Sequence, residues 1–370
     1  QYVLSENTTE ITESMAEHIS VSPNDNTTLI YGSGIAEEDV PQVGDIIFAK
    51  PSESLPYGFL GKVTSVSGDA NKGYTIQTET ASLYEAFDKL YINDTAELVA
   101  VTPSTRTEDT NIVTGDFGIE KELKVNYTNE ESPYQVKGTL SAGASLQLTV
   151  EIDKEKQLKY MAFTFVPFVK AGAEFSVSDG WNEDGEFGDF PLKDYNCGLI
   201  MLGGVVPLVP AVQLHLYVQP QGSFSFTTSI ECEAKGAAGA EFKNNVWESG
   251  FNPIESDEES PLDFLTSEIK VEGELFYGFG VELKGKFFNL DNMKMFIQPQ
   301  TGLKLSGDFT VSSDNTLTWE EKLKDLSITS SNILSGSAGV DATLLGEDAE
   351  SEFDFSEVEW GEKEYHILPI

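Results

Sequence analysis

The stretch Leu214–Phe242, LHLYVQPQGSFSFTTSIECEAKGAAGAEF, decides the fold of this chain. Almost every even-numbered position in it is apolar or small, whereas most odd-numbered positions are polar. Successive side chains of a β-strand point to opposite faces of its sheet, so this period of two predicts a strand with one dry face. The alternation returns on even positions from Val136 to Ile152 and on odd positions from Val271 to Val311. We therefore predict a mainly β protein with a large antiparallel β domain of long, coiled strands.

The same alternation assigns side chains to the two faces of the predicted sheet. Around the middle of the stretch, we expect four apolar residues to face the core: Leu216, Val218, Phe224 and Phe226. Three polar residues are expected to face outward: Ser223, Ser225 and Thr227.

Three prolines, Pro167, Pro220 and Pro299, lie within the alternating stretches. Proline has no N–H to donate to a strand ladder, so each is expected at a bulge, a turn or a sheet edge. The apolar phase is the same before and after Pro220, which fits either a bend in one long strand or a loop with an odd number of residues. A continuous strand from 214 to 242 would extend roughly 95 Å at about 3.3 Å per residue. Since this exceeds ordinary strands, we expect the stretch to be interrupted.

Residues 1–101 differ from the rest in having short strand signals and frequent turn residues. Three short segments separated by Pro, Gly and Asn are predicted strands: Asp45–Ala49, Gly61–Val66 and Tyr74–Thr78. Residues 102–110, TPSTRTEDT, contain no apolar residue other than Pro103, so we predict a linker there. The sequence thus predicts a small α+β or barrel-like domain over residues 1–101 and the large antiparallel β domain over residues 111–370.

The segment Ala81–Leu90, ASLYEAFDKL, is the predicted helix of the amino-terminal domain and should be its longest. Ser82 is followed three residues later by Glu85, which is the spacing of a capping box. Leu83 and Phe87 fall on one face of such a helix, so we expect both to be buried.

The chain has 62 acidic and 23 basic residues, which gives a formal net charge of −39 at pH 7. A field of this sign repels phosphate backbones and anionic lipids, so we expect neither nucleic acid nor a membrane surface as a partner. Arg106 is the only arginine, so no pair of arginines can clamp a phosphate. No stretch approaches 18 apolar residues, so we expect no transmembrane helix.

The sequence carries no catalytic signature that we can assign. Its three histidines, His18, His215 and His366, are isolated, and the motifs HExxH, GxSxG and CxxC do not occur. We therefore predict no catalytic residues and favour a protein that is not an enzyme. His215 lies on the polar phase of its strand, so we expect it on the wetter face of the sheet.

Cys197 and Cys232 are the only cysteines. They are compatible with one disulfide or with two buried thiols. Cys232 lies in the apolar phase of its strand, and free cysteine packs as a small hydrophobic residue, so we favour buried thiols.

One loop, Asp179–Asp189 (DGWNEDGEFGD), is dense in oxygen ligands. Four of its residues are close enough in sequence to converge on calcium, which is the only cofactor we consider: Asn182, Asp184, Glu186 and Asp189. The alternative is a solvated acidic connection between strands. Trp181 and Phe187 are suited to stacking on a sugar, or to anchoring the loop on the sheet.

Two stretches resemble modules that recur in large secreted bacterial surface proteins. The first is Val40–Ile92, with VPQVGDIIFA, GFLGKVTSV and YTIQTETASLYEAF; the second is Leu199–Phe242, followed by Trp247 and the next alternating run. The resemblance implies a secreted surface lipoprotein of Bacteroidales type, located extracellularly or on the outer-membrane surface of a Gram-negative bacterium. It transfers no catalytic residue.

These observations favour a non-enzymatic extracellular protein that serves as an adhesive or structural scaffold, with an extracellular protein or a glycan as its partner. The alternative is a glycan-binding module or a glycoside-active enzyme. An enzyme of that class needs two carboxylates about 5 to 10 Å apart in a pocket, whereas an adhesive scaffold needs only an exposed patch.

Overall fold

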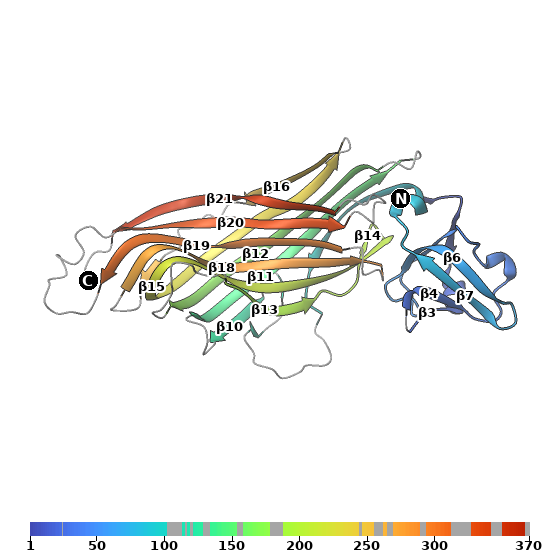
Figure 1. The fold of residues 1–370 in the computed structure, drawn as a ribbon, viewed down its shortest axis with the longest axis horizontal. Coiled ribbons are helices and arrows are strands. Elements are labelled where there is room, and N and C mark those ends of the chain that lie inside the picture. The colour runs from blue at the N-terminus through green and yellow to red at the C-terminus, as the bar shows by residue number, and fades with distance from the viewer. Residues whose placement is uncertain are drawn as a thin grey trace.

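The computed structural model describes residues 1–23, 25–101, 113–114, 117–118, 121–128, 134–153, 158–177, 188–243, 246–254, 262–264, 269–288, 294–311, 327–341 and 350–366. Side chains are described in part of these ranges. The protein is mainly β, as the alternating pattern predicts (Figure 1). Within the described ranges, the strands form one sheet of six strands and one of 15.

The six-stranded sheet is built from residues 8–79 in the order β2-β5-β6-β7-β4-β3. Each of the three short strands that the sequence predicts is present in it, as β5, β6 and β7. The bounds are β2 (Thr8–Ile11), β3 (Ile19–Ser22), β4 (Asp25–Tyr31), β5 (Ile46–Ala49), β6 (Phe59–Asp69) and β7 (Gly73–Glu79). Two short helices accompany this sheet: α1 (Glu13–Ala16) and the 3-10 helix η1 (Glu37–Asp39).

The larger sheet is antiparallel throughout its described pairs and follows the order β1-β8-β11-β12-β15-β18-β19-β20-β21. Its main strands are β1 (Tyr2–Leu4), β8 (Phe87–Leu98), β11 (Tyr134–Ile152), β12 (Leu158–Val177), β15 (Val206–Lys243), β18 (Ile269–Phe287), β19 (Lys294–Val311), β20 (Ser327–Asp341) and β21 (Glu350–His366). Shorter strands pair beside this path: β9 (Val113–Thr114), β10 (Glu122–Thr128), β13 (Gly188–Asn196), β14 (Ile200–Leu202), β16 (Val246–Ile254) and β17 (Leu262–Phe264). Figure 1 shows these strands running along the long axis of the molecule, with the six-stranded sheet at one end.

The prediction that the stretch Leu214–Phe242 is interrupted is wrong, because β15 is a single strand of 38 residues. Different strands pair with successive segments of β15. Over Ala211–Val218 it pairs with β13 and β18, and over its last third it pairs with β12 and β16. Several shorter strands therefore support one strand that is much longer than any of the strands beside it.

Two of the four residues of β15 that are predicted to face the core have described side chains, and both are buried as expected. Leu216 and Val218 are buried in the main core. The side chains of Phe224, Phe226, Ser223, Ser225 and Thr227 lie outside the described residues.

Within the described residues, only Pro220 lies at a local sheet edge, which is one of the three alternatives that the sequence allows. Pro167 and Pro299 lie in strands that pair on both sides, so the prediction of a bulge, turn or edge is wrong for them. Over Gln219–Ser225, which contains Pro220, β15 has described partners only in β18. The ladder from β12 to β15 skips Pro167, and the ladder from β18 to β19 skips Pro299. Neither skip changes the register, so these prolines do not create bulges. The missing N–H is thus accommodated by a local gap in hydrogen bonding.

The predicted helix Ala81–Leu90 is mostly wrong. Only α2 (Leu83–Ala86) is helical, and it is no longer than α1; β8 begins at Phe87. Leu83 and Phe87 are buried, as expected. Beyond the helix, Leu90 and Ile92 are buried while Tyr91 is exposed, which is a period of two. Pairing of β8 with β1 and β11 therefore outweighs the local helical preference.

Two hydrophobic cores meet at β5, which is buried on both of its faces. Ile46 and Phe48 pack in the main core with residues of the larger sheet, whereas Ile47 and Ala49 pack in the smaller core of the six-stranded sheet. The predicted linker at 102–110 lies outside the described residues. However, β1 and β8 precede it and pair in the larger sheet, so that sheet includes strands from both predicted domains. Within the described part of the chain, no helix is long and apolar enough to cross a membrane.

Candidate functional site

A charged cluster with a buried histidine and a buried glutamate lies where β15 is flanked by β13 and β18. The Nδ1 atom of His215 lies 2.6 Å from Oδ1 of Asp189 on β13, and Nε2 lies 3.2 Å from Oε2 of Glu282 on β18. That Glu282 oxygen also lies 2.8 Å from Nζ of Lys284. The four side chains form a line of alternating charge across three strands.

The expectation that His215 lies on the wetter face is wrong, because the residue is only 5% exposed. The physical reason is that Asp189 and Glu282 supply hydrogen-bond partners for both ring nitrogens. A buried polar group that is hydrogen-bonded in this way avoids the cost of burial without a partner.

Burial and pairing act in opposite directions on the pKa of His215. Burial by itself would lower the pKa, but the hydrogen bonds and negative charges of Glu282 and Asp189 outweigh it, so the pKa is raised above 6.5. Burial would raise the pKa of Glu282, but hydrogen bonds from His215 and Lys284 outweigh it and the pKa is lowered. The raised pKa of His215 and the lowered pKa of Glu282 both favour the ion-paired form. In this form the imidazolium donates from both ring nitrogens.

Tyr217 closes the cluster on the same face of β15. Its ring stacks on His215 with the ring centres 5.6 Å apart and the planes at 8°, and it is fully buried. Its register partner on β18 is Gly278, and that of His215 is Gly280. Glycine at these positions leaves space beside the two rings. This segment of β15 is therefore buried on both faces, rather than on the single dry face that the alternation predicts.

The predicted calcium ligands are described only in part. Asp189 is described, and its carboxylate contacts His215; Asn182, Asp184 and Glu186 lie outside the described residues, as do the predicted sugar-stacking residues Trp181 and Phe187. Among the described side chains, no group of three or more His, Cys, Asp or Glu residues is placed to hold a metal ion. In the His215 cluster the two carboxylates meet opposite sides of the ring, so the three groups do not converge on one point.

The cluster is poorly suited to acid–base or nucleophilic chemistry. A catalytic histidine needs one nitrogen free for the reacting group, whereas both nitrogens of His215 contact carboxylates. A glycosidase needs one protonated carboxylic acid, which requires a raised pKa, whereas the pKa of Glu282 is lowered. The imidazole also fills the space between Asp189 and Glu282 that a glycosidic bond and a water would need. The arrangement is an electrostatic link between strands.

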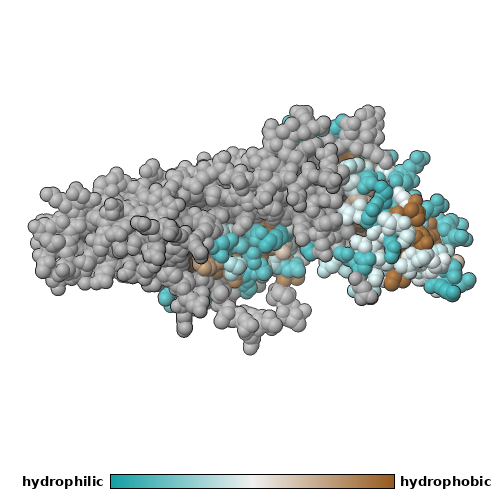
Figure 2. Space-filling model, viewed as in Figure 1, coloured by the Kyte–Doolittle hydropathy of each residue, from teal (hydrophilic) through white to brown (hydrophobic). Residues whose placement is uncertain are grey.

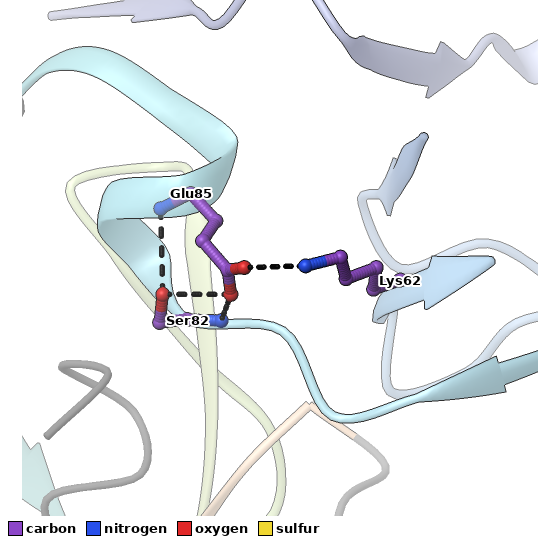
Figure 3. Close-up of polar contacts among 3 residues, drawn as sticks. All are labelled: Lys62, Ser82 and Glu85. Atoms are coloured by element: carbon purple, nitrogen blue, oxygen red, sulfur yellow. Dashed lines mark hydrogen bonds and ion pairs between the residues drawn. The ribbon is translucent and has the colours of Figure 1, made fainter. Parts of the chain in front are cut away.

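A second polar cluster lies at the join between α2 and the six-stranded sheet (Figure 3). Oγ of Ser82 accepts from the backbone N–H of Glu85 at 3.4 Å, and Oε2 of Glu85 accepts from the backbone N–H of Ser82 at 2.9 Å. The predicted capping box is thus confirmed. Lys62 of β6 adds an ion pair at 3.2 Å, and these contacts outweigh burial and lower the pKa of Glu85. Glu85 contacts both Ser82 and Lys62, so this cluster fixes the helix against the sheet.

Cys197 is a buried free thiol, which agrees with the prediction for that residue. Burial raises the pKa of Cys197 to about 11, so little reactive thiolate forms near neutral pH. The side chain of Cys232 lies outside the described residues.

The described surface is mixed in character. Figure 2 shows apolar residues in separate small patches among hydrophilic ones on the visible face of the amino-terminal unit. The most exposed large apolar side chains come from different segments: Val43 at 65%, Val101 at 55% and Tyr91 at 52%. Scattered single residues of this kind are normal for a protein surface.

Sequence reasoning missed Glu282 as a partner of His215 and Lys284 as a partner of Glu282. Both lie on even positions of the run from Val271 to Val311, whose odd positions are apolar, so a polar face was indicated. The register that brings Glu282 beside His215, with Gln213 opposite Glu282, is a tertiary property that the alternation does not contain.

Comparisons with protein families, with curated proteins and with solved structures found no match to this chain. The resemblance to secreted bacterial surface modules therefore stays a prediction.

Proposed function

We propose that this chain is a non-enzymatic extracellular protein that serves as a structural or adhesive scaffold at a cell surface. The observation that carries the proposal is β15, whose 38 residues run without interruption beside strands of the same sheet. At about 3.3 Å per residue its contour length is roughly 125 Å. Such a strand, held by ladders along its length, suits a rigid spacer between a surface and a partner.

The packing of β5 between the two hydrophobic cores supports the same proposal. A spacer transmits force or position only if its parts do not hinge freely. Because β5 is buried on one face against the larger sheet and on the other in its own core, the six-stranded sheet is held to the end of the elongated sheet by apolar packing (Figure 1). The amino-terminal unit is then well placed to present a binding surface at one end.

The proposed setting follows from the resemblance and the charge. We place the protein on the outer surface of a Gram-negative bacterium of Bacteroidales type, held by a lipid anchor, with an extracellular protein or a glycan as partner. A net charge of −39 keeps such a chain soluble and disfavours anionic lipid and nucleic acid as partners.

Location is tested by labelling cells of the source organism with antibodies raised against the full chain. We expect labelling of intact cells, at the same level before and after permeabilisation, with a cytoplasmic protein as the control that labels only after permeabilisation. Labelling that needs permeabilisation would overturn the extracellular assignment.

Activity is tested by incubating the full chain with a panel of polysaccharides and measuring released reducing ends, in parallel with a glycan array. We expect no release. Release by the wild-type chain would overturn the non-enzymatic assignment, and its loss in Glu282→Gln would place the reaction at the charged cluster. Binding on the array without release supports adhesion to a glycan.

A further inference from the structure

Strand β13 is held to the rest of the sheet less regularly than its neighbours. Within the described residues, β15 is its only strand partner. The register between them shifts between Pro191 and Lys193, which leaves Leu192 as an extra residue. Pro191 also has no N–H to donate. The middle of β13 is therefore the weakest part of its main-chain ladder.

The side-chain link from Asp189 to His215 lies at this weak point. Pro191 is the register partner of His215, and Asp189 is two residues before it. The contact of 2.6 Å thus ties β13 to β15 where the ladder is disturbed. Because His215 is also bonded to Glu282, the link continues to β18.

The other end of β13 is held by different contacts. The ring of Tyr195 lies 5.6 Å from that of Phe117, and the backbone oxygen of Asn196 accepts a hydrogen bond from the N–H of Val101 at 2.8 Å. Leu192 is buried in the main core. The strand is therefore attached by an ionic contact at its beginning, and by apolar contacts and a main-chain hydrogen bond toward its end.

Strand β11 of the same sheet provides the contrast. It pairs with β12 in unbroken register from Tyr134 to Glu151, and with β8 or β10 on its other edge. Opening β11 would break ladders on both of its edges, whereas opening β13 breaks one irregular ladder. Local opening is expected first where the fewest contacts are lost.

We propose that β13 is a strap that opens from β15 as a unit while the rest of the sheet stays folded, with the link from Asp189 through His215 to Glu282 setting how often it opens. Opening uncovers the main-chain edge of β15 from Ala211 to Val218. The strap is thus a conformational device at an edge of the larger sheet, as far as the described residues show.

The proposal is tested by hydrogen exchange of the full chain at pH 6, measured by mass spectrometry on peptides from residues 188–196 and 134–152. In the wild-type chain we expect the β13 peptide to exchange much faster than the β11 peptide. Asp189→Asn keeps the size of the side chain but removes its charge, and should speed exchange in β13 by roughly tenfold, with β11 unchanged.

Asp194→Asn is the matched control, because Asp194 lies on the same strand and is exposed. It should leave exchange in both peptides at the wild-type rate. Equal protection of β13 and β11 in the wild-type chain would overturn the proposal without any variant. An increase spread evenly over both peptides in Asp189→Asn would also overturn it, because opening would then be global.

Discussion

The ring of Phe48 on β5 lies edge-on to the ring of Phe288, with centres 6.3 Å apart and planes at 80°. Phe288 follows β18 and has a φ of 56°, a left-handed conformation that is uncommon outside glycine. Its N–H donates to the backbone oxygen of Pro207 at 3.2 Å, which holds the turn in place. Aromatic rings in this geometry attract one another beyond the effect of their buried area. The contact joins the six-stranded sheet to the end of the larger sheet.

We predict that Phe48→Ala destabilises both sheets together. Phe48 is fully buried, so the variant should lose about 3 to 5 kcal/mol of unfolding free energy. All four tryptophans lie beyond residue 180, outside the six-stranded sheet. Urea unfolding followed by tryptophan fluorescence should therefore show a lower midpoint, although the change is made in the other sheet. The exposed Val43→Ala serves as control and should change stability by less than about 0.5 kcal/mol. An unchanged fluorescence midpoint in Phe48→Ala would show that the sheets unfold independently.

Ser82→Ala removes one half of the capping box of α2. The Ser82 hydroxyl and the Glu85 carboxylate each satisfy a backbone N–H at the start of the helix, so we expect a loss of about 1 kcal/mol. Thr12 is the N-cap of α1 but makes no side-chain capping hydrogen bond. Thr12→Ala is thus the matched control and should cost clearly less in the same thermal or urea unfolding experiment. Equal losses in the two variants would contradict the role assigned to the capping box.

Tyr31 is fully buried in the core of the six-stranded sheet, and its hydroxyl has no hydrogen-bond partner within the described structure. Burial also raises the pKa of this hydroxyl, so it stays uncharged. Removing an unsatisfied polar group saves its desolvation cost, so Tyr31→Phe should leave stability unchanged or raise it by about 1 kcal/mol. Tyr2→Phe is the comparison, because the hydroxyl of Tyr2 donates to Oε1 of Glu10 at 3.1 Å, and its removal should lower stability. A clear loss in Tyr31→Phe would point to a partner such as a buried water.

The class of the fold could be predicted because a period of two is a local property of the sequence. The same period over residues 136–152 predicted β11. The positions of β5, β6 and β7 were predicted from the turn residues that separate short apolar segments. Predicting where strands end was less successful. Residues 87–98 form a strand because β1 and β11 pair with it, and β15 continues through Pro220 because β18 supports it there. Both outcomes depend on distant partners that a local pattern does not encode.

The charged cluster was likewise predicted only where a local pattern was enough, and not where it depends on residues distant in sequence. The alternation placed His215 on the polar phase of its strand, but a polar phase is wet only if no other side chains cover it. The carboxylates of Asp189 and Glu282 come from strands 26 and 67 residues away in sequence. Asp189 was singled out as an oxygen ligand in an acidic loop, and the structure assigns its carboxylate to a histidine.

We predict that the charged cluster around His215 makes the stability of the chain depend on pH. The folded pKa of His215 is raised above its ordinary value of 6.5, so its contribution to stability is complete below pH 6.5 and is lost as the pH rises through the folded pKa. The folded pKa of Glu282 is lowered from 4.5, so its contribution is complete above pH 4.5 and is lost as the pH falls through the folded pKa. The cluster should therefore contribute most between pH 4.5 and 6.5.

The urea midpoint of the full chain, measured at intervals from pH 5 to 9, checks this prediction on the alkaline side. His215→Gln should be less stable than the wild-type chain at pH 6, and the difference should shrink as the pH rises, because the wild-type chain loses the charge of the imidazolium. His18→Gln, which replaces an exposed histidine, is the control, and its urea midpoint at pH 6 should stay close to that of the wild-type chain. A constant difference between His215→Gln and wild type from pH 5 to 9 would mean that His215 stabilises the sheet through packing and neutral hydrogen bonds, and that its ion pairs with Asp189 and Glu282 contribute nothing.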